Sequence, residues 1–306
     1  MKVVNEALVE MIKEIAGADS VFMDEPMSSH TTFRIGGEAE VFVKIKEEAA
    51  FIKLIQQLNK FEIPYYIIGN GSNLLVGDKG IQGVVIETSG SFHEIHVDGD
   101  VIEAQAGALL SQVANVAKDN GLTGLEFAAG IPGTIGGALV MNAGAYDGEM
   151  KMVVESVKVV SKKGEIMILD NDTMEFSYRH SVLKEYPFVA LSTRLKLQKG
   201  DTEAIVDKMK DLAMKRREKQ PLEFPSAGST FKRPEGNFAG KLIMDAGLRG
   251  YRVGGAQVSE KHCGFVVNVG GATASDVVEL MDSVSETVKD RFNVELEPEV
   301  IFLGEF

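Results

Sequence analysis

The feature that most constrains the fold is a glycine-rich segment, residues 121–148, which lies between two patterns typical of β-hairpins. One pattern, 94–97 with 101–104, flanks an Asp-Gly-Asp turn, and the other, 153–160 with 165–169, flanks Lys-Lys-Gly. Glycine lets the backbone approach other groups without a Cβ in the way. Because regular elements bracket the segment, we expect a tight, ordered loop there and not a low-complexity linker.

Helical and extended patterns continue on both sides of this segment. A strand is expected at 65–68 and a final one at 294–303. The expected helices lie at 1–20, 47–59, 109–119, 202–219 and 240–246, with one more that opens on the capping-box pattern Thr273-x-x-Asp276. The mixture predicts an α+β protein. Prolines after 219 indicate a boundary, and we expect three parts: an N-terminal lobe (1–80), a second lobe (81–200), and a linker helix with a smaller rear domain (201–306).

Charge and cysteine content narrow the possible partners. The 306 residues include 45 acidic and 32 basic side chains, a formal net charge of −13, which repels nucleic-acid backbones. No run reaches the roughly 18 apolar residues of a membrane span. The one cysteine, Cys263, excludes an internal disulfide and fits a reducing compartment. These properties predict a cytoplasmic protein with neither nucleic acid nor membrane as a partner; no obligate protein partner is evident.

Standard nucleotide and metal signatures are missing. Neither G-x-G-x-x-G after a strand nor the P-loop pattern occurs. Among the histidines only His93 and His96 have a spacing that suits metal ligands, and beside a predicted strand they are more simply surface residues. We therefore expect no metal.

Two glycine-rich loops remain as candidates for phosphate binding. One is 69–73, after the predicted strand, and the other is 130–137, followed by 141–146. Consecutive backbone N–H groups in such loops form a concavity that holds anions. Tight turns and close helix packing would explain the same glycines, so the residues alone leave both interpretations open.

Six short segments resemble those of the UDP-N-acetylenolpyruvoylglucosamine reductase family, in order and with compatible spacing. Three are shared in outline with other FAD enzymes of the vanillyl-alcohol-oxidase type: 31–37 (TTFRIGG), 69–76 (GNGSNLLV) and 124–137 (GLEFAAGIPGTIGG). Three are more particular: 178–181 (YRHS), 226–234 (SAGSTFKRP) and 297–300 (EPEV). The chain resembles the shorter subgroup of that family.

The resemblance implies a two-lobed FAD-binding domain of the vanillyl-alcohol-oxidase (PCMH) type with a smaller α+β substrate-binding domain. It also implies that NADPH and FAD reduce UDP-N-acetylglucosamine enolpyruvate to UDP-N-acetylmuramate for peptidoglycan synthesis. By the same resemblance, a hydride from the flavin would reach the β-carbon, Ser229 would supply the proton, and Arg179 and Glu299 would stabilise the enolate. Taken singly, each of these three residues would be an ordinary loop or strand-end residue; only the motif context favours function.

The same resemblance implies the binding residues. FAD, held without a covalent bond, would contact both loops and the segment after them: Gly69, Asn70, Gly71, Ser72, Asn73, Leu74, Gly130, Ile131, Pro132, Gly133, Thr134, Gly136, Gly137, Asn142, Ala143 and Gly144. The sugar nucleotide would contact Tyr178, Lys232, Lys241, Gly250, Tyr251, Ser259, His262 and Asn268. Lys232 would also be a candidate to help Ser229 donate.

Two other functions stay open. An FAD-linked oxidase or dehydrogenase acting on an alcohol or hydroxy acid would share the glycine-rich loops but has no reason to carry the Tyr-Arg and Gly-Ser-x-Phe-Lys segments. A non-catalytic flavin-binding or nucleotide-binding module would need neither Arg179 nor Ser229.

Overall fold

A computed structural model describes residues 3–90 and 92–306. The chain divides into two compact units, each assembled from three stretches of sequence. The first unit comprises Met1–Met23, Val41–Asn70 and Gly83–Arg216, and the second comprises Asp24–Glu40, Gly71–Gln82 and Arg217–Phe306. The chain passes back and forth between the two units, so neither unit is one continuous segment.

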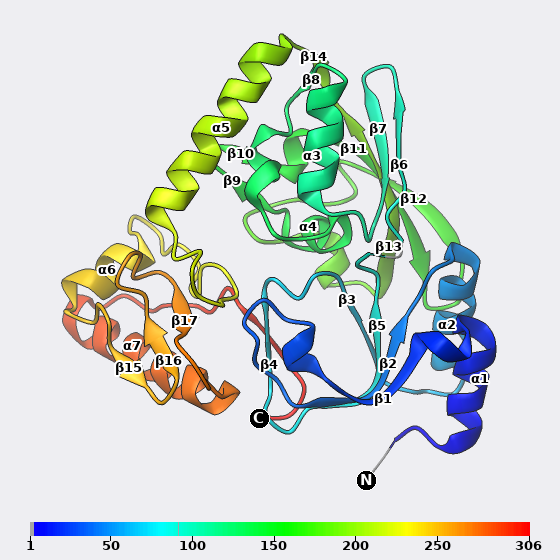
Figure 1. The fold of residues 1–306 in the computed structure, drawn as a ribbon, viewed down its shortest axis with the longest axis horizontal. Coiled ribbons are helices and arrows are strands. Elements are labelled where there is room, and N and C mark those ends of the chain that lie inside the picture. Colours follow the sequence, from blue (N-terminus) through cyan, green and yellow to red (C-terminus); the bar gives the residue numbers. More distant parts are fainter. Residues whose placement is uncertain (1–2, 91) are drawn as a thin grey trace. The chain divides into compact units, whose positions relative to one another are not determined.

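Two amphipathic helices begin the first unit and pack against each other (Figure 1). They are α1 (Glu6–Ala16), capped by Asn5, and α2 (Glu48–Lys60). Both expected helices are confirmed, and α2 buries the expected apolar residues Phe51, Ile55 and Leu58.

A four-stranded sheet follows in the order β1-β2-β5-β3. Its members are β1 (Val21–Pro26), β2 (Glu38–Lys44), β5 (Ile81–Glu87) and β3 (Tyr65–Ile68). β3, the strand expected before the first glycine loop, runs parallel to β5 with Tyr65 opposite Val84.

A five-stranded antiparallel sheet, in the order β12-β11-β13-β7-β6, forms the rest of the first unit. The two expected hairpins supply four of its strands. Its members are β6 (Ile95–Asp98), β7 (Val101–Gln105), β11 (Val154–Ser161), β12 (Ile166–Asp170) and β13 (Phe188–Lys196).

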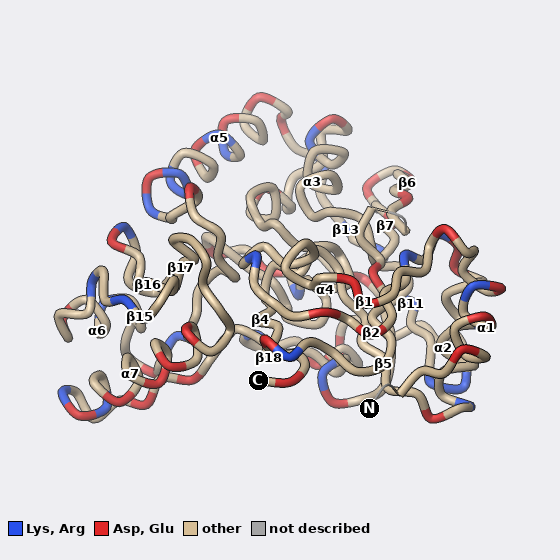
Figure 2. The backbone as a smooth tube through the Cα atoms, turned by 60° about the horizontal axis from the view of Figure 1, so that its bottom comes forward, with Lys and Arg blue, Asp and Glu red and all other residues tan. Residues whose placement is uncertain are grey.

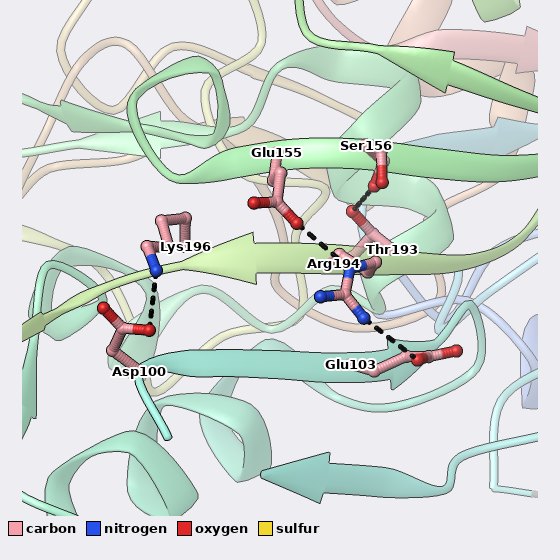
Figure 3. A network of polar contacts seen from close by, with 7 residues as sticks. All are labelled: Asp100, Glu103, Glu155, Ser156, Thr193, Arg194 and Lys196. Carbon is pink, nitrogen blue, oxygen red and sulfur yellow. Dashed lines mark hydrogen bonds and ion pairs between the residues drawn. The ribbon is translucent and has the colours of Figure 1, made fainter. Parts of the chain in front are cut away.

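Polar contacts join three strands across this sheet (Figure 3). Arg194 on β13 lies 3.0 Å from Glu155 on β11 and 3.9 Å from Glu103 on β7. The hydrogen bond that Arg194 donates to Glu155 raises the pKa of Arg194. Opposite charges at these cross-strand positions favour the observed register.

Further helices begin in the first unit (Figure 1). α3 (Leu110–Asp119) and α5 (Thr202–Lys219) confirm the expected helices, and α4 (Ile135–Met141) follows the second glycine loop and contacts β13 and β7. Acidic and basic residues are interleaved along α5 (Figure 2). The short elements are η1 (Ala18–Ser20), β8 (Leu122–Thr123), η3 (Glu126–Gly130), β9 (Gly144–Ala145), β10 (Gly148–Glu149), η4 (Met150–Met152), η5 (Val182–Lys184) and β14 (Gln198–Lys199).

The second unit is a three-stranded antiparallel sheet against which α7 (Ala274–Phe292) packs. The remaining elements are η2 (Met27–Ser29), β4 (Leu74–Val76), α6 (Ala239–Asp245), β15 (Arg252–Val253), β16 (Ala256–Val258), β17 (Val266–Asn268) and β18 (Ile301–Leu303). Phe33, Ile35 and Leu75 join its core from the earlier stretches.

Two expectations for this unit have different outcomes. The capping box at Thr273 and Asp276 is confirmed, and Asp78 also accepts the N–H groups of Ala274 and Ser275 at 2.7 and 2.9 Å. The expected strand at 294–303 is wrong for most of its length, because only Ile301–Leu303 finds a strand partner, parallel β4. Pro298 has no N–H to donate and makes only an isolated bridge with Phe231.

Within residues 3–90 and 92–306, no helix has the length and apolar character to cross a membrane. The same residues contain no group of three or more His, Cys, Asp or Glu side chains that could hold a metal ion.

Candidate active site

The two glycine-rich loops meet in the first unit. The Asn70 amide donates to the Pro132 carbonyl at 2.7 Å, and a Cβ on Gly69 would overlap Thr134 Oγ1. Thr134 Oγ1 in turn accepts the Gly137 N–H at 3.4 Å. Gly69 is therefore required because the two loops approach each other closely. For this glycine, packing is a sufficient explanation, one of the two interpretations left open by the sequence.

Gly137 of the second loop has no such packing reason. Gly130 and Gly137 are exposed, as is Pro132 between them. A Cβ on Gly137 would find only Thr134 Oγ1, 3.7 Å away, within contact distance in the described part of the chain. The backbone at these positions is thus exposed where a phosphate-bearing ligand could approach it, although the Gly137 N–H already donates to Thr134 Oγ1.

The rest of the first loop belongs to the second unit. Gly71 has φ 59°, and a Cβ there would overlap the His30 carbonyl, so this position also requires glycine for the fold. Ser72 and Leu74 are half-buried beside it. The Asn73 amide donates to the Glu299 carbonyl at 3.1 Å, and the Ile301 N–H donates to the Asn73 carbonyl at 2.9 Å.

Asn142, expected to contact FAD, is buried and bonded within the first unit. Its Nδ2 donates to Glu149 and to the Ser177 carbonyl, both at 3.1 Å, while its Oδ1 accepts the Lys151 N–H. Both amide hydrogens are therefore engaged by the protein. These bonds connect the segment after the glycine loop to the turn that carries Arg179.

That turn, Ser177 to His180, is closed by an isolated antiparallel bridge between its ends. Arg179 has φ 56°, in the left-handed region that non-glycine residues rarely adopt, and its guanidinium lies 4.9 Å from the centre of the Tyr178 ring. Strained backbone of this kind persists where the surroundings hold it, and it clusters at functional sites.

Ser229 and Glu299 come together in the second unit. The Glu299 N–H donates to the carbonyl of Thr230, the residue after Ser229, at 2.8 Å. The Lys232 N–H donates to the Glu297 carbonyl, and Lys232 Nζ lies 3.0 Å from Glu297 Oε2. The two motif segments, distant in sequence, thus lie side by side. Arg179 belongs to the other unit.

The expected sugar-nucleotide residues of the second unit lie in two places. Gly250, Tyr251 and Ser259 lie around the β15–β16 hairpin, and Ser259 Oγ accepts the N–H groups of Lys261 and His262. Burial lowers the pKa of His262, which favours the neutral ring.

Asn268 lies on β17, opposite Ala256 of β16, whereas Lys241 lies outside this sheet. Lys241 lies on α6, where it pairs with Asp245. The Asn268 side chain donates to the Phe33 carbonyl and accepts from Gly270 and Ala272, so it has protein partners on both its oxygen and its nitrogen.

Two charged residues near the second glycine loop were not singled out from the sequence. Buried Glu126 accepts hydrogen bonds from Thr123, the Gly124 N–H and Lys208. Arg216 on α5 packs against Gly130. Glu126 lies within a motif and could have been noticed, but Arg216 is one of many charges on a charged helix.

Comparison with known proteins identifies the family. Residues 39–170 match the family model "FAD binding domain", and residues 220–303 match "UDP-N-acetylenolpyruvoylglucosamine reductase, C-terminal domain". The UDP-N-acetylenolpyruvoylglucosamine reductase of Caldanaerobacter subterraneus subsp. tengcongensis is 52% identical over 98% of this chain and 99% of its own. The chain belongs to the UDP-N-acetylenolpyruvoylglucosamine reductase family.

Two more relatives agree with this membership. The UDP-N-acetylenolpyruvoylglucosamine reductase of Lachnoclostridium phytofermentans is 51% identical over 98% of both chains. The crystal structure of UDP-N-acetylenolpyruvylglucosamine reductase from Thermus caldophilus superposes with a TM-score of 0.79 at 35% identity, covering 92% of this chain and 98% of that one. The expected family and the expected α+β fold class, with an FAD-binding part and a reductase-specific C-terminal part, are confirmed.

Proposed function

We propose that this protein reduces UDP-N-acetylglucosamine enolpyruvate to UDP-N-acetylmuramate, with FAD as cofactor and NADPH as co-substrate, in the synthesis of peptidoglycan precursors. The observation that carries the proposal is the 52% identity with a named reductase across 98% of the chain. The open second loop and the pairing of the Ser229 and Glu299 segments support it.

Both glycine loops and the segment after them would hold FAD. The open backbone at Gly130 and Gly137 suits the diphosphate, and Asn70 lies beside them. When bound, FAD transfers hydride equivalents from NADPH to the enolpyruvyl double bond. The glycine-rich loops contain no histidine or cysteine for covalent attachment, so FAD would be released when the protein is denatured.

Arg179 would bind the substrate carboxylate. A guanidinium forms paired, charge-assisted hydrogen bonds with a carboxylate, and these strengthen as negative charge accumulates there during the reaction. The closed turn and the Tyr178 ring restrict where the guanidinium can point. Glu299 would assist at the enolate, and it can donate a hydrogen bond there only in its protonated form.

Ser229 would deliver the proton to the carbon next to the carboxylate. Its hydroxyl is half-buried, and the residue after it is fixed by the Glu299 N–H. A serine hydroxyl is a weak acid, so it requires a neighbour that stabilises the resulting oxyanion. Lys232 stays a candidate, although its ammonium already contacts Glu297.

The remaining assignments follow the same resemblance. Tyr178, Lys241, Gly250, Tyr251, Ser259, His262 and Asn268 would form the sugar-nucleotide site together with Lys232. We also propose the three-part division at residues 80 and 200, and a cytoplasmic location, where NADPH and a nucleotide-linked sugar would be supplied.

The decisive experiment begins with the visible spectrum of the purified protein. We expect a yellow protein whose flavin absorbance is bleached by NADPH without oxygen and restored by the enolpyruvyl sugar, with a product two hydrogens heavier by mass spectrometry. Restoration by oxygen with no response to the sugar would instead favour an FAD-linked oxidase. A colourless protein that FAD cannot reconstitute would overturn the proposal.

A further inference from the structure

Arg216 is a half-buried cation that the proposed reaction does not use. It lies near the end of α5, and its side chain lies against Gly130 in the first unit. A Cβ on Gly130 would lie 3.1 Å from Arg216 Cδ and 3.2 Å from its Nη1. The guanidinium is thus placed at the start of the second glycine loop.

Three lysines of α5 have acidic partners, but Arg216 has none among residues 3–90 and 92–306. Lys208, Lys210 and Lys215 lie 3.2, 3.4 and 2.6 Å from carboxylate oxygens. Burial lowers the pKa of Arg216, and the only neighbour that acts in the opposite direction is the Tyr146 phenol. Because arginine stays protonated throughout the working pH range, the group is a partly desolvated and uncompensated positive charge.

A charge removed from water is costly unless an opposite charge or hydrogen bonds compensate it. Here the compensation can come from a ligand, because Gly130 beside the guanidinium is exposed, as are Pro132 and Gly137 of the same loop. A planar guanidinium suits phosphate oxygens, because its N–H groups can bind two of them at a time.

We infer that Arg216 binds the diphosphate of a nucleotide held on the 130–137 loop. The inference rests on the proposed function for the kind of nucleotide present. Two diphosphates belong to that reaction, that of FAD and that of the UDP-sugar, and the test separates them.

The test compares Arg216→Gln with Arg217→Gln, which removes the same charge from the exposed neighbouring residue. One arm strips the flavin and titrates each apo-protein with FAD and with riboflavin, which lacks phosphate, by flavin fluorescence. The other arm titrates FAD-loaded protein with UDP by calorimetry. We expect Arg216→Gln to weaken either FAD or UDP binding by about tenfold or more, since bonds between charged groups are the stronger class. Riboflavin binding should be unchanged, and Arg217→Gln should stay within about twofold of the wild type.

The stability of the apo-protein separates binding from a structural role. Removing an uncompensated charge should leave the melting temperature of the apo-protein unchanged or higher. The rise in melting temperature that the ligand causes should be smaller for Arg216→Gln than for the wild type. A lower apo melting temperature with unchanged FAD and UDP affinities would overturn the inference. If Arg216→Gln does not fold, Arg216→Lys replaces it in the test, because lysine keeps the positive charge but lacks the planar guanidinium. We expect Arg216→Lys to weaken binding of the same ligand by several-fold. Wild-type affinity of Arg216→Lys for both FAD and UDP would also overturn the inference. A protein that binds FAD through Arg216 but ignores the enolpyruvyl sugar would refute the proposed function alone.

Discussion

Ser229 follows Gly228, whose φ of 78° suits glycine, and precedes Thr230, which is bonded to both Gly264 and Glu299. Replacing Ser229 by Ala removes one hydroxyl from this fixed backbone, so folding and FAD binding should survive. We expect stopped-flow absorbance to show normal bleaching by NADPH. Reoxidation by the enolpyruvyl sugar should be about 10²–10⁴-fold slower, the usual effect of losing a positioned acid, or about 3–5 kcal/mol of barrier.

The matched control for this prediction is Ser226→Ala, which removes a hydroxyl from the same loop and should reoxidise at the wild-type rate. Fast reoxidation of Ser229→Ala would exclude Ser229 as the acid and make Glu299 the next candidate.

At Arg179 the effects on stability and on catalysis can be separated, because the residue has left-handed backbone. Arg179→Ala and Arg179→Gly both lose the guanidinium, so both should slow the enolpyruvyl step far more than NADPH oxidation. Only glycine relieves the backbone strain, and we expect urea unfolding to show Arg179→Gly more stable than Arg179→Ala by about 1–2 kcal/mol. Equal slowing of both half-reactions would mean that Arg179 supports the NADPH site or the fold instead.

At the scale of elements, Glu126 joins the short helix η3 to α5 through Lys208. Burial alone would raise the pKa of Glu126. Hydrogen bonds from Thr123, from the N–H groups of Glu126 and Gly124, and from Lys208 outweigh it and lower the pKa. The ionised Glu126 therefore stabilises the fold fully at pH values above its pKa in the unfolded chain, about 4.3. This contribution is lost as the pH falls through the lower pKa of Glu126 in the folded protein.

Glu126→Gln should consequently reduce the free energy of unfolding at pH 7 by about 1–3 kcal/mol. The difference in the free energy of unfolding between variant and wild type should be smaller at pH 3.5. Urea denaturation at both pH values measures this, with the exposed Glu203→Gln as a control that should change little. A gap that does not depend on pH would show that the charge of Glu126 is not what stabilises this contact.

Elements with a local pattern were predictable, and those defined by a distant partner were not. α5 has its expected bounds because its sequence is helical throughout, and β3 because a short apolar run ends at glycine. β2 and β5 were not expected individually, since nearly continuous burial gives no alternation to recognise. Residues 294–300 look extended, yet strand pairing at 301–303 depends on β4 far upstream.

The same distinction holds for the candidate site. The motifs at 178–181, 226–234 and 297–300 were visible in the sequence, but the pairing of Thr230 with Glu299 and the contact of Gly69 with Thr134 are tertiary. Local spacing therefore could not reveal them. Arg216 could not be chosen from the sequence either, because its lack of an acidic partner is a property of the fold.

At the scale of the whole molecule, the C-terminal unit depends on residues that precede it by a long way. Phe33, Ile35 and Leu75 are 0–2% exposed in its core, β4 pairs with β18, and Asp78 caps α7. A fragment of residues 217–306 loses the burial of three large apolar side chains, about 4–9 kcal/mol together, out of a typical domain stability of about 5–15 kcal/mol.

We therefore expect this fragment to lack cooperative unfolding by circular dichroism under conditions in which the full chain melts sharply. A single steep transition in the isolated fragment would contradict the importance of the earlier stretches.

The pairing of Leu74–Val76 with Ile301–Leu303 also sets an order of events during synthesis. β4 leaves the ribosome early but cannot find its partner until every other described helix and strand has been made, whereas the last residue of the first unit, Arg216, emerges well before that. Through most of translation the nascent chain therefore carries an unpaired strand edge and an open core, the features that favour aggregation and require chaperones. A chain whose translation stalls before residue 301 keeps both features and would be distinguishable from the finished product by a protease.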